Sequence, residues 1–272
     1  MKEKIWLHIS QKKFMELNNW KSYHSYDTYD SNIGDVSAVS LFTESNDFKE
    51  LIKVLENRNI SFEVFRREYA FTKKEIVNAE ILKLIVDGNA QNSFSPDHDG
   101  YTCPVCREKV QFKQVNNLQV DYKVIKKYDI STTYMGHTEI IVSERVKNIL
   151  IKEQITGIRF VPVYQIGKVE EIIPEFHHLM LEEGIGEVVE PSIVDKDIRC
   201  SKCGFYKKFL CQTPLNFKRN TWNNKDICFT ENWFGAPPLS QGKWVIISKR
   251  LYSILKENKI KAFSVEPAFF ID

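Results

Sequence analysis

The spacing of apolar and polar side chains predicts a mixed α/β region over residues 1–95. Residues 5–9 alternate weakly and indicate an edge strand, and residues 61–65 alternate in the same way and predict a second strand. Between these segments, four apolar residues recur at the spacing of one helical face: Phe48, Leu51, Ile52 and Leu55. Residues 21–35 are rich in Ser, Tyr, Asp and Asn, which is typical of a loop.

Residues 72–100 indicate a helix followed by a domain boundary. Thr72 and Glu75 form a capping-box signature at a helix start. Apolar residues then continue along one predicted helical face: Ile76, Ala79, Leu82 and Ile85. Residues 89–100 lack periodicity and contain many turn-forming residues, so we expect residues 1–95 and 96–272 to form separate regions.

The second region contains an internal repeat. When the sequence is slid by 97 positions, the separation of Cys103 from Cys200, further identical residues coincide: Cys106 with Cys203, Phe112 with Phe209, Asp129 with Asp226, Ile130 with Ile227, and Thr133 with Thr230. With an eight-residue insertion in the second copy, residues 143–163 align with residues 248–268 at six identities. We therefore expect two copies of one unit, at residues 101–168 and 198–272.

Each copy has the same predicted local structure. Short apolar runs at residues 140–142 and 244–247 predict buried strands, and Ser143 and Ser248 follow them at N-cap positions. Matching apolar residues then form one helical face in each copy: Val146, Ile149 and Leu150, and Leu251, Ile254 and Leu255. A second apolar segment ends in proline. The unit is therefore predicted as knuckle, strand, helix and strand, and the fold class as α+β.

Two CxxC pairs, Cys103 with Cys106 and Cys200 with Cys203, predict one structural zinc site. Structural zinc takes four ligands in a tetrahedron, and thiolate sulfur is a preferred donor. Because each copy supplies only two thiols, we expect one shared, zinc-ribbon-like site at the junction of the copies. Four thiolates leave no open position for water or substrate, so a catalytic zinc ion is not expected.

Other interpretations of the cysteines remain open. A redox pair usually opens a helix in a thioredoxin-like unit, whereas CPVC here precedes KVQFKQV. The four cysteines could also be buried side chains that have lost a metal ion. Cys211 and Cys228 coincide with Gln114 and Ser131 of the first copy, so we interpret them as small buried hydrophobic residues and not as ligands.

The charge balance gives no general support for nucleic-acid binding, because the 272-residue chain has a formal net charge of only +2. Basic residues do gather around the first knuckle: Arg107, Lys109, Lys113, Lys123, Lys126 and Lys127. A zinc-ribbon nucleic-acid-binding or regulatory module is therefore the alternative function. Few aromatic residues accompany these charges, and nucleic acid is not the expected partner.

An acidic stretch lies between the two copies, because residues 169–191 carry seven glutamates and no lysine or arginine. Such a run is typical of a solvated connector. It is also a candidate docking surface for a basic protein, since complementary charge speeds encounter. The candidate partner-binding residues are Glu170, Glu171, Glu175, Glu182, Glu183, Glu187 and Glu190.

No enzyme motif is recognisable, so the chain is not expected to be an enzyme. It has no phosphate-binding glycine loop, no catalytic-triad order and no HExxH. The adjacent His177 and His178 are not spaced for one metal on a helical face, and we interpret them as packing or surface residues. Without a signal-peptide core or a long apolar run, a cytoplasmic location and no membrane partner are expected.

The sequence resembles the double-CxxCG family of bacterial immunity proteins found with polymorphic toxins. The matching residues are CPVC at 103–106, CSKCG at 200–204, and IIVSERVKNILIKEQITGIRFVPV at 140–163. The resemblance covers roughly residues 70–270, with Arg107 where the family has glycine. It implies a cytoplasmic immunity protein that binds and neutralises a cognate, co-encoded toxin domain, with one zinc ion as a structural staple.

Overall fold

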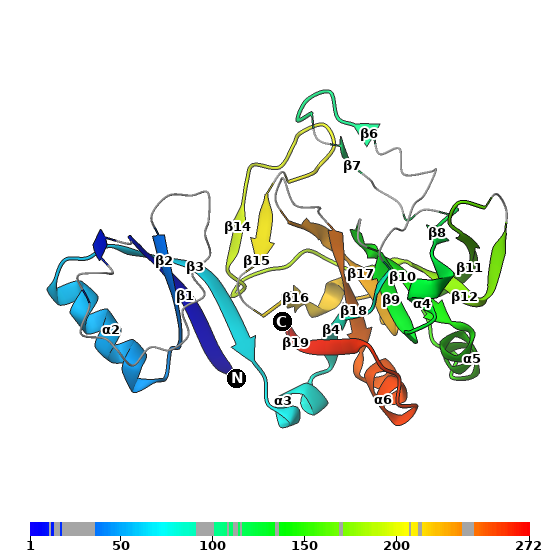
Figure 1. Cartoon of the computed structure of the whole chain (residues 1–272), viewed down its shortest axis with the longest axis horizontal. Helices are drawn as coiled ribbons and strands as arrows, with labels where there is room; N and C mark the ends of the chain where they lie inside the picture. The colour runs from blue at the N-terminus through cyan, green and yellow to red at the C-terminus, as the bar shows by residue number, and fades with distance from the viewer. Residues whose placement is uncertain are drawn as a thin grey trace. The chain divides into compact units, whose positions relative to one another are not determined.

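The computed structural model describes most of the chain, in these ranges: 1–10, 12–13, 17, 36–90, 101–107, 109–110, 114, 116–133, 136–168, 171–206, 208–211, 214–235 and 242–272. The predicted loop at 21–35 lies wholly outside these ranges. The chain forms two compact units, Met1–Glu75 and Ile76–Asp272 (Figure 1). Most of the expected boundary segment, residues 91–100, lies outside the described residues.

The first unit is a three-stranded antiparallel sheet with one helix. The sheet has the order β2-β1-β3, with β1 at Lys2–Ser10, β2 at Val36–Phe42 and β3 at Phe62–Ala70. Both predicted strands are therefore confirmed, but β1 is central and the expectation of an edge strand is wrong. A strand that buries only alternate side chains can be central when one face of an antiparallel sheet stays solvated.

The predicted helix of the first unit is α2, Asn46–Asn57. It begins where the Ser45 hydroxyl accepts a hydrogen bond from the Phe48 N–H at 3.1 Å, which satisfies one of the otherwise unpaired N–H groups of the first turn. Leu51 and Leu55 of α2 pack with Leu7 of β1 in a core of their own.

The capping box at Thr72 is confirmed, but the long helix predicted after it is wrong. Thr72 and Glu75 exchange backbone-to-side-chain hydrogen bonds at 2.8 and 3.2 Å. The helix, α3, covers only Lys73–Asn78, and strand β4 follows at Ile81–Val86. The apolar run ILKLIV fits a helix face or a buried strand equally well, and pairing with strands on both sides decides for the strand. Residues 76–90 thus belong to the second unit.

The second unit is built on two six-stranded sheets. The first sheet has the order β5-β9-β10-β12-β11-β8, with these bounds: β5 Asn89–Ala90, β9 Ile130–Thr133, β10 Gly136–Ser143, β12 Ile172–Leu181, β11 Ile158–Gln165 and β8 Gln119–Val120. The second sheet has the order β13-β17-β18-β4-β19-β16, with these further bounds: β13 Glu183–Ile185, β17 Ile227–Phe234, β18 Gly242–Ser248, β19 Phe263–Ile271 and β16 Asn216–Lys218.

Two helices complete the shared core between these sheets. The predicted helices are confirmed as α5, Glu144–Lys152, and α6, Lys249–Glu257. The hydroxyls of Ser143 and Ser248 cap these helices, as their position after an apolar strand predicts. They accept hydrogen bonds from the N–H groups of Val146 and Leu251 at 3.3 and 3.1 Å. One apolar cluster combines β4, β10, β12, β17 and β18 with both helices.

Short elements connect these parts. The remaining helices and strands are α4 Tyr122–Ile125, the 3-10 turn Arg219–Thr221, the pair β6 Tyr101–Thr102 with β7 Lys109–Val110, and the pair β14 Val194–Lys196 with β15 Phe209–Cys211. The described residues form a mixed α+β fold that consists mostly of strands. None of the helices in the described part of the chain has the length and apolar character needed to span a bilayer.

Candidate metal centre

Two tight backbone turns position the four cysteines. In the first knuckle the Arg107 N–H donates to the Cys103 carbonyl at 2.8 Å, and in the second the Gly204 N–H donates to the Cys200 carbonyl at 2.9 Å. Both closing residues have left-handed backbone, with φ of 61° at Arg107 and 71° at Gly204. Arg107 therefore keeps the turn that glycine favours, although a β-carbon makes this conformation costly.

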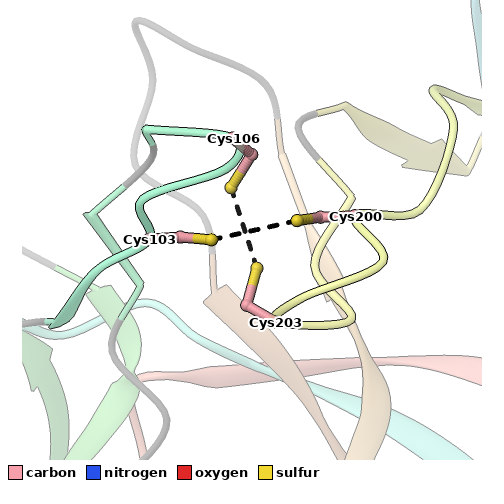
Figure 2. A group of neighbouring side chains, drawn as sticks. All are labelled: Cys103, Cys106, Cys200 and Cys203. Carbon is pink, nitrogen blue, oxygen red and sulfur yellow. Dashed lines mark hydrogen bonds between the residues drawn. The ribbon is translucent and has the colours of Figure 1, made fainter.

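The four cysteine sulfurs converge on one point between the knuckles, as Figure 2 shows. All four Sγ atoms lie within 4.8 Å of one another. Between the knuckles, the Sγ atoms of Cys103 and Cys200 lie 3.9 Å apart, and those of Cys106 and Cys203 lie 3.7 Å apart. Four sulfurs on tight turns can therefore bind a metal ion, although the separation of the pairs along the chain exceeds that of an ordinary zinc ribbon.

The backbone around the knuckles favours thiolate. N–H groups of Cys203 and Lys202 lower the pKa of Cys200 to about 6, and N–H groups of Cys106 and Val105 lower the pKa of Cys103. Burial, together with the neighbouring sulfurs, instead raises the pKa of Cys203 to about 12. The sulfurs repel further negative charge, which a bound cation would neutralise.

The other two cysteines do not join this cluster. Cys228 is fully buried in β17, and burial raises the pKa of its thiol to about 12. Cys211 is half-buried at the end of β15. Across the described ranges, the four knuckle cysteines form the only convergent group of three or more potential metal ligands from Cys, His, Asp or Glu.

The acidic stretch is not a plain connector, because its central part is strand β12. That strand pairs with β10 on one side and β11 on the other, and β13 follows it in the second sheet. The interpretation as a solvated connector is therefore wrong. Only one glutamate, Glu175, lies within β12, and Ile173, Phe176 and Leu179 of this strand are buried.

The candidate partner-binding glutamates lie on several elements. Glu170 is outside the described residues, and Glu183 begins β13. Exposed or half-exposed carboxylates pair with basic neighbours: Glu171 with Lys168 at 2.8 Å, Glu182 with Lys225 at 3.6 Å and Glu187 with Arg199 at 3.2 Å. Glu171 and Glu175 line a surface hollow of about 660 Å³, and Glu190 is exposed.

Sequence reasoning missed a buried polar group in the first sheet. His178 is fully buried, and its Nε2 lies 2.6 Å from Glu139 Oε2 and 3.5 Å from Gln114 Nε2. His177, next to it, instead contacts Glu144 and Lys147 of α5. The two histidines point to different partners because adjacent strand residues face opposite sides of a sheet. The strand assignment of β12 would have predicted this divergence.

Comparisons with known proteins do not connect the chain to a family. No model of a known protein family matches it, and no curated protein matches it. The site must therefore be interpreted from its own chemistry.

Proposed function

We propose that the four knuckle cysteines hold one zinc ion with a structural role. The observation that supports this proposal is the convergence of four sulfur donors within 4.8 Å. A set of four sulfurs with no carboxylate or imidazole favours zinc over harder ions and fills a tetrahedral shell completely. The ion would supply a link between the two knuckles and no reactive position.

Metal content tests this proposal directly. Elemental analysis of the purified chain should find about one zinc ion per chain, and Cys200→Ser should abolish stoichiometric binding. Cys211→Ser is the matched control, because Cys211 lies outside the sulfur cluster. Free titration of all four knuckle thiols in the native protein would contradict a bound metal ion.

We also propose that the shared site joins two copies of a knuckle-strand-helix-strand unit. Support comes from the matching elements β10-α5-β11 and β18-α6-β19, each with a serine cap before its helix. Equivalent helix ends add to this support, since Glu153 and Asn258 have nearly the same backbone angles. In this interpretation each copy contributes one CxxC pair.

For the whole chain we propose an immunity function, in which it binds a co-encoded toxin domain in the cytoplasm and blocks it without catalysis. The resemblance of the double-knuckle pattern to immunity proteins carries this proposal. The partner surface we propose includes Glu171 and Glu175, which line the hollow beside the exposed Ile172. A basic toxin side chain would find three carboxylates, those of Asp121, Glu171 and Glu175, beside apolar surface there, and would compete with Lys123 and Lys168, which line the same hollow.

Protection of cells tests the immunity function. Coexpression of the chain with the product of the adjacent toxin gene should restore growth. Reversal of charge in Glu171→Lys with Glu175→Lys should lower the association rate and weaken protection. Glu50→Lys, an exposed change on α2 of the first unit, is the matched control. Absence of any protection would remove the function, whereas full protection by the reversed variant would move the contact surface elsewhere.

The second candidate is a nucleic-acid-binding or regulatory module. The observation that favours it is the exposed Arg107 on the first knuckle, followed by Lys109 in β7. Binding of random RNA that weakens steeply with salt would support this function, because phosphate contacts release counterions. Insensitivity of toxin binding to competing RNA would separate the two candidates.

A further inference from the structure

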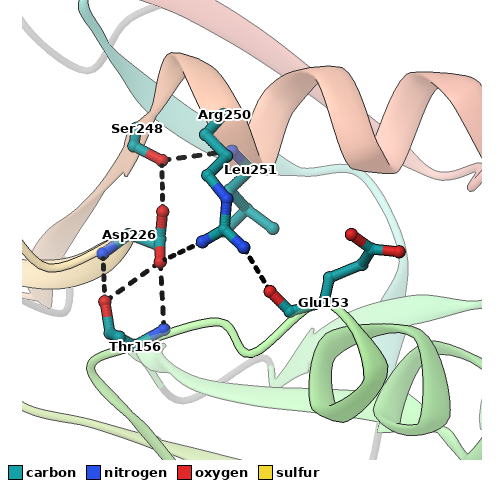
Figure 3. Close-up of polar contacts among 6 residues, drawn as sticks. All are labelled: Glu153, Thr156, Asp226, Ser248, Arg250 and Leu251. Carbon is teal, nitrogen blue, oxygen red and sulfur yellow. Dashed lines mark hydrogen bonds and ion pairs between the residues drawn. The ribbon is translucent and has the colours of Figure 1, made fainter.

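A reciprocal set of polar contacts joins the two halves of the second unit, residues 76–167 and 168–272. Arg250 donates to Asp226 Oδ2 at 2.9 Å and also to the Glu153 carbonyl at the end of α5 (Figure 3). Arg145 donates to Asp129 at 3.1 Å and to the Asn258 carbonyl at the end of α6. Each arginine thus binds an aspartate of its own half and caps the helix of the other half.

Backbone N–H groups repeat the same reciprocity. Thr156 N–H donates to Asp226 Oδ2 at 3.1 Å, and Lys261 N–H donates to Asp129 Oδ2 at 3.4 Å. Contacts of residue i with j′ and of j with i′ are the signature of a two-fold interface, here within one chain.

The two sheets match strand for strand. In each sheet the strand before the helix pairs with two neighbours. Both edge strands of each sheet are parallel to the strand they pair with. In the first sheet these pairs are β5 with β9 and β8 with β11, and in the second sheet they are β13 with β17 and β16 with β19. The registers agree as well. The pair Ile140–Leu179 of the first sheet corresponds to the pair Val245–Leu84 of the second. The pair Pro162–His177 corresponds in the same way to the pair Pro267–Leu82.

The chain order of the central strand breaks this match. In the first sheet the strand between β10 and β11 is β12, which follows them in the chain. In the second sheet the equivalent strand between β18 and β19 is β4, which precedes every strand of the first sheet in the chain. Each central strand therefore begins one half in sequence but pairs inside the sheet of the other half.

From this arrangement we infer that residues 76–167 and 168–272 are two copies of one unit that exchange their central strands, as two subunits do in a strand-swapped dimer. The repeat is longer than the knuckle-strand-helix-strand unit, since it begins at β4 and at β12. The inference does not rest on zinc or on toxin binding.

Strand exchange makes the halves inseparable even without a covalent link. Ile81 and Leu82 of β4 are completely buried in the sheet of the second half. Ile173, Phe176 and Leu179 of β12 are buried in the sheet of the first half. Removal of either strand would leave a gap between two strands that have no hydrogen bonds to each other, with unpaired backbone groups on both.

Cleavage of the full chain between the halves tests the exchange. A specific protease site can be inserted after Gly167, in a turn where nothing packs within 4 Å of an added β-carbon. After cleavage, residues 1–167 and 168–272 should elute together at the volume of the intact chain, both with metal and after removal of metal by a chelator. Separation of folded fragments on cleavage or on chelation would overturn the inference.

A pair of engineered cysteines locates β4 independently. In the variant Leu84→Cys with Val245→Cys, oxidation should link the cleaved fragments, because these residues are register partners. In Leu84→Cys with Ile140→Cys, the pair expected for an unexchanged strand, no disulfide should form. Formation of the second disulfide, or co-elution without the first, would also overturn the exchange. Loss of zinc or of toxin binding would leave both results unchanged.

Discussion

Asp129 and Asp226 occupy equivalent positions in the two halves, yet the surroundings of the second are much richer. The Asp226 side chain is 11% exposed and accepts hydrogen bonds from Thr156 and Ser248 in addition to Arg250. The Asp129 side chain is 21% exposed and is held by Arg145 and the Lys261 N–H. Two aspartates with equivalent backbone positions can therefore contribute unequally to stability. The hydroxyl of Thr156, which donates to Asp226, has no counterpart in Lys261.

The largest expected effect tests whether the halves contribute equally at the metal centre. Cys103→Ser and Cys200→Ser should each lower the free energy of unfolding by several kcal/mol, because structural zinc contributes on the order of 10 kcal/mol. Urea unfolding with and without a chelator measures this loss. A chelator should destabilise the natural chain but neither serine variant. A loss confined to one of the two variants would show that the knuckles are not equivalent.

Substitution of the two aspartates, in contrast, should lower stability by unequal amounts. Asp226→Ala should cost about 3 kcal/mol, since it removes charged hydrogen bonds at a buried site. Asp129→Ala should cost about 1 kcal/mol, because its ion pair is more exposed and solvent screens it. Chemical unfolding of the two variants measures the difference. Equal losses would mean that the extra hydroxyl contacts at Asp226 contribute nothing.

Acid should remove the contribution of Asp226 to stability. Burial alone would raise the pKa of Asp226, but donors on Thr156, Ser248 and Arg250 outweigh it and lower that pKa below the ordinary 3.8. Its contribution to stability is therefore complete above pH 3.8 and is lost as the pH falls through the lowered value. The stability of Asp226→Asn should change less between pH 5 and pH 3 than that of the natural chain. Identical acid profiles would contradict this assignment.

The smallest expected effect concerns the turn that closes each knuckle. Arg107→Gly should raise the free energy of unfolding slightly, by up to about 1 kcal/mol, because it relieves left-handed backbone at a non-glycine residue. Gly204→Ala should lower it by about 1 kcal/mol, since φ is 71° there and the added methyl meets only ordinary contacts. Thermal unfolding of both variants measures these shifts, and shifts of equal sign would contradict the equivalence of the two turns.

Local features of the fold were predictable from the sequence where short-range chemistry decides. Ser143 and Ser248 cap their helices directly, and the capping box at Thr72 needs only four residues. The length of the helix after Thr72 was not predictable, because Leu82 and Leu84 fit either period and only the distant partners β18 and β19 select the strand.

The candidate metal centre was predictable for a different reason. Cysteine is scarce and its CxxC spacing is specific, so two such pairs were enough to predict that Cys103 lies close to Cys200, as it does in the structure. The buried contact of His178 with Glu139 carried no such signal, since 39 positions separate two common residue types. The acidic stretch was misleading because most of its glutamates lie before and after β12, whereas the strand itself carries only Glu175 among mainly apolar residues.

The position of β4 also has a consequence for synthesis on the ribosome. Leu82 is made about 165 residues before its partner Ile247. At roughly 5–20 residues per second, this apolar strand waits on the order of ten seconds for its sheet. The first sheet can close as soon as β12 emerges, whereas β4 stays without its sheet neighbours until β18 and β19 have been made. The nascent chain therefore presents the apolar segment ILKLIV without its native sheet partners for most of its synthesis.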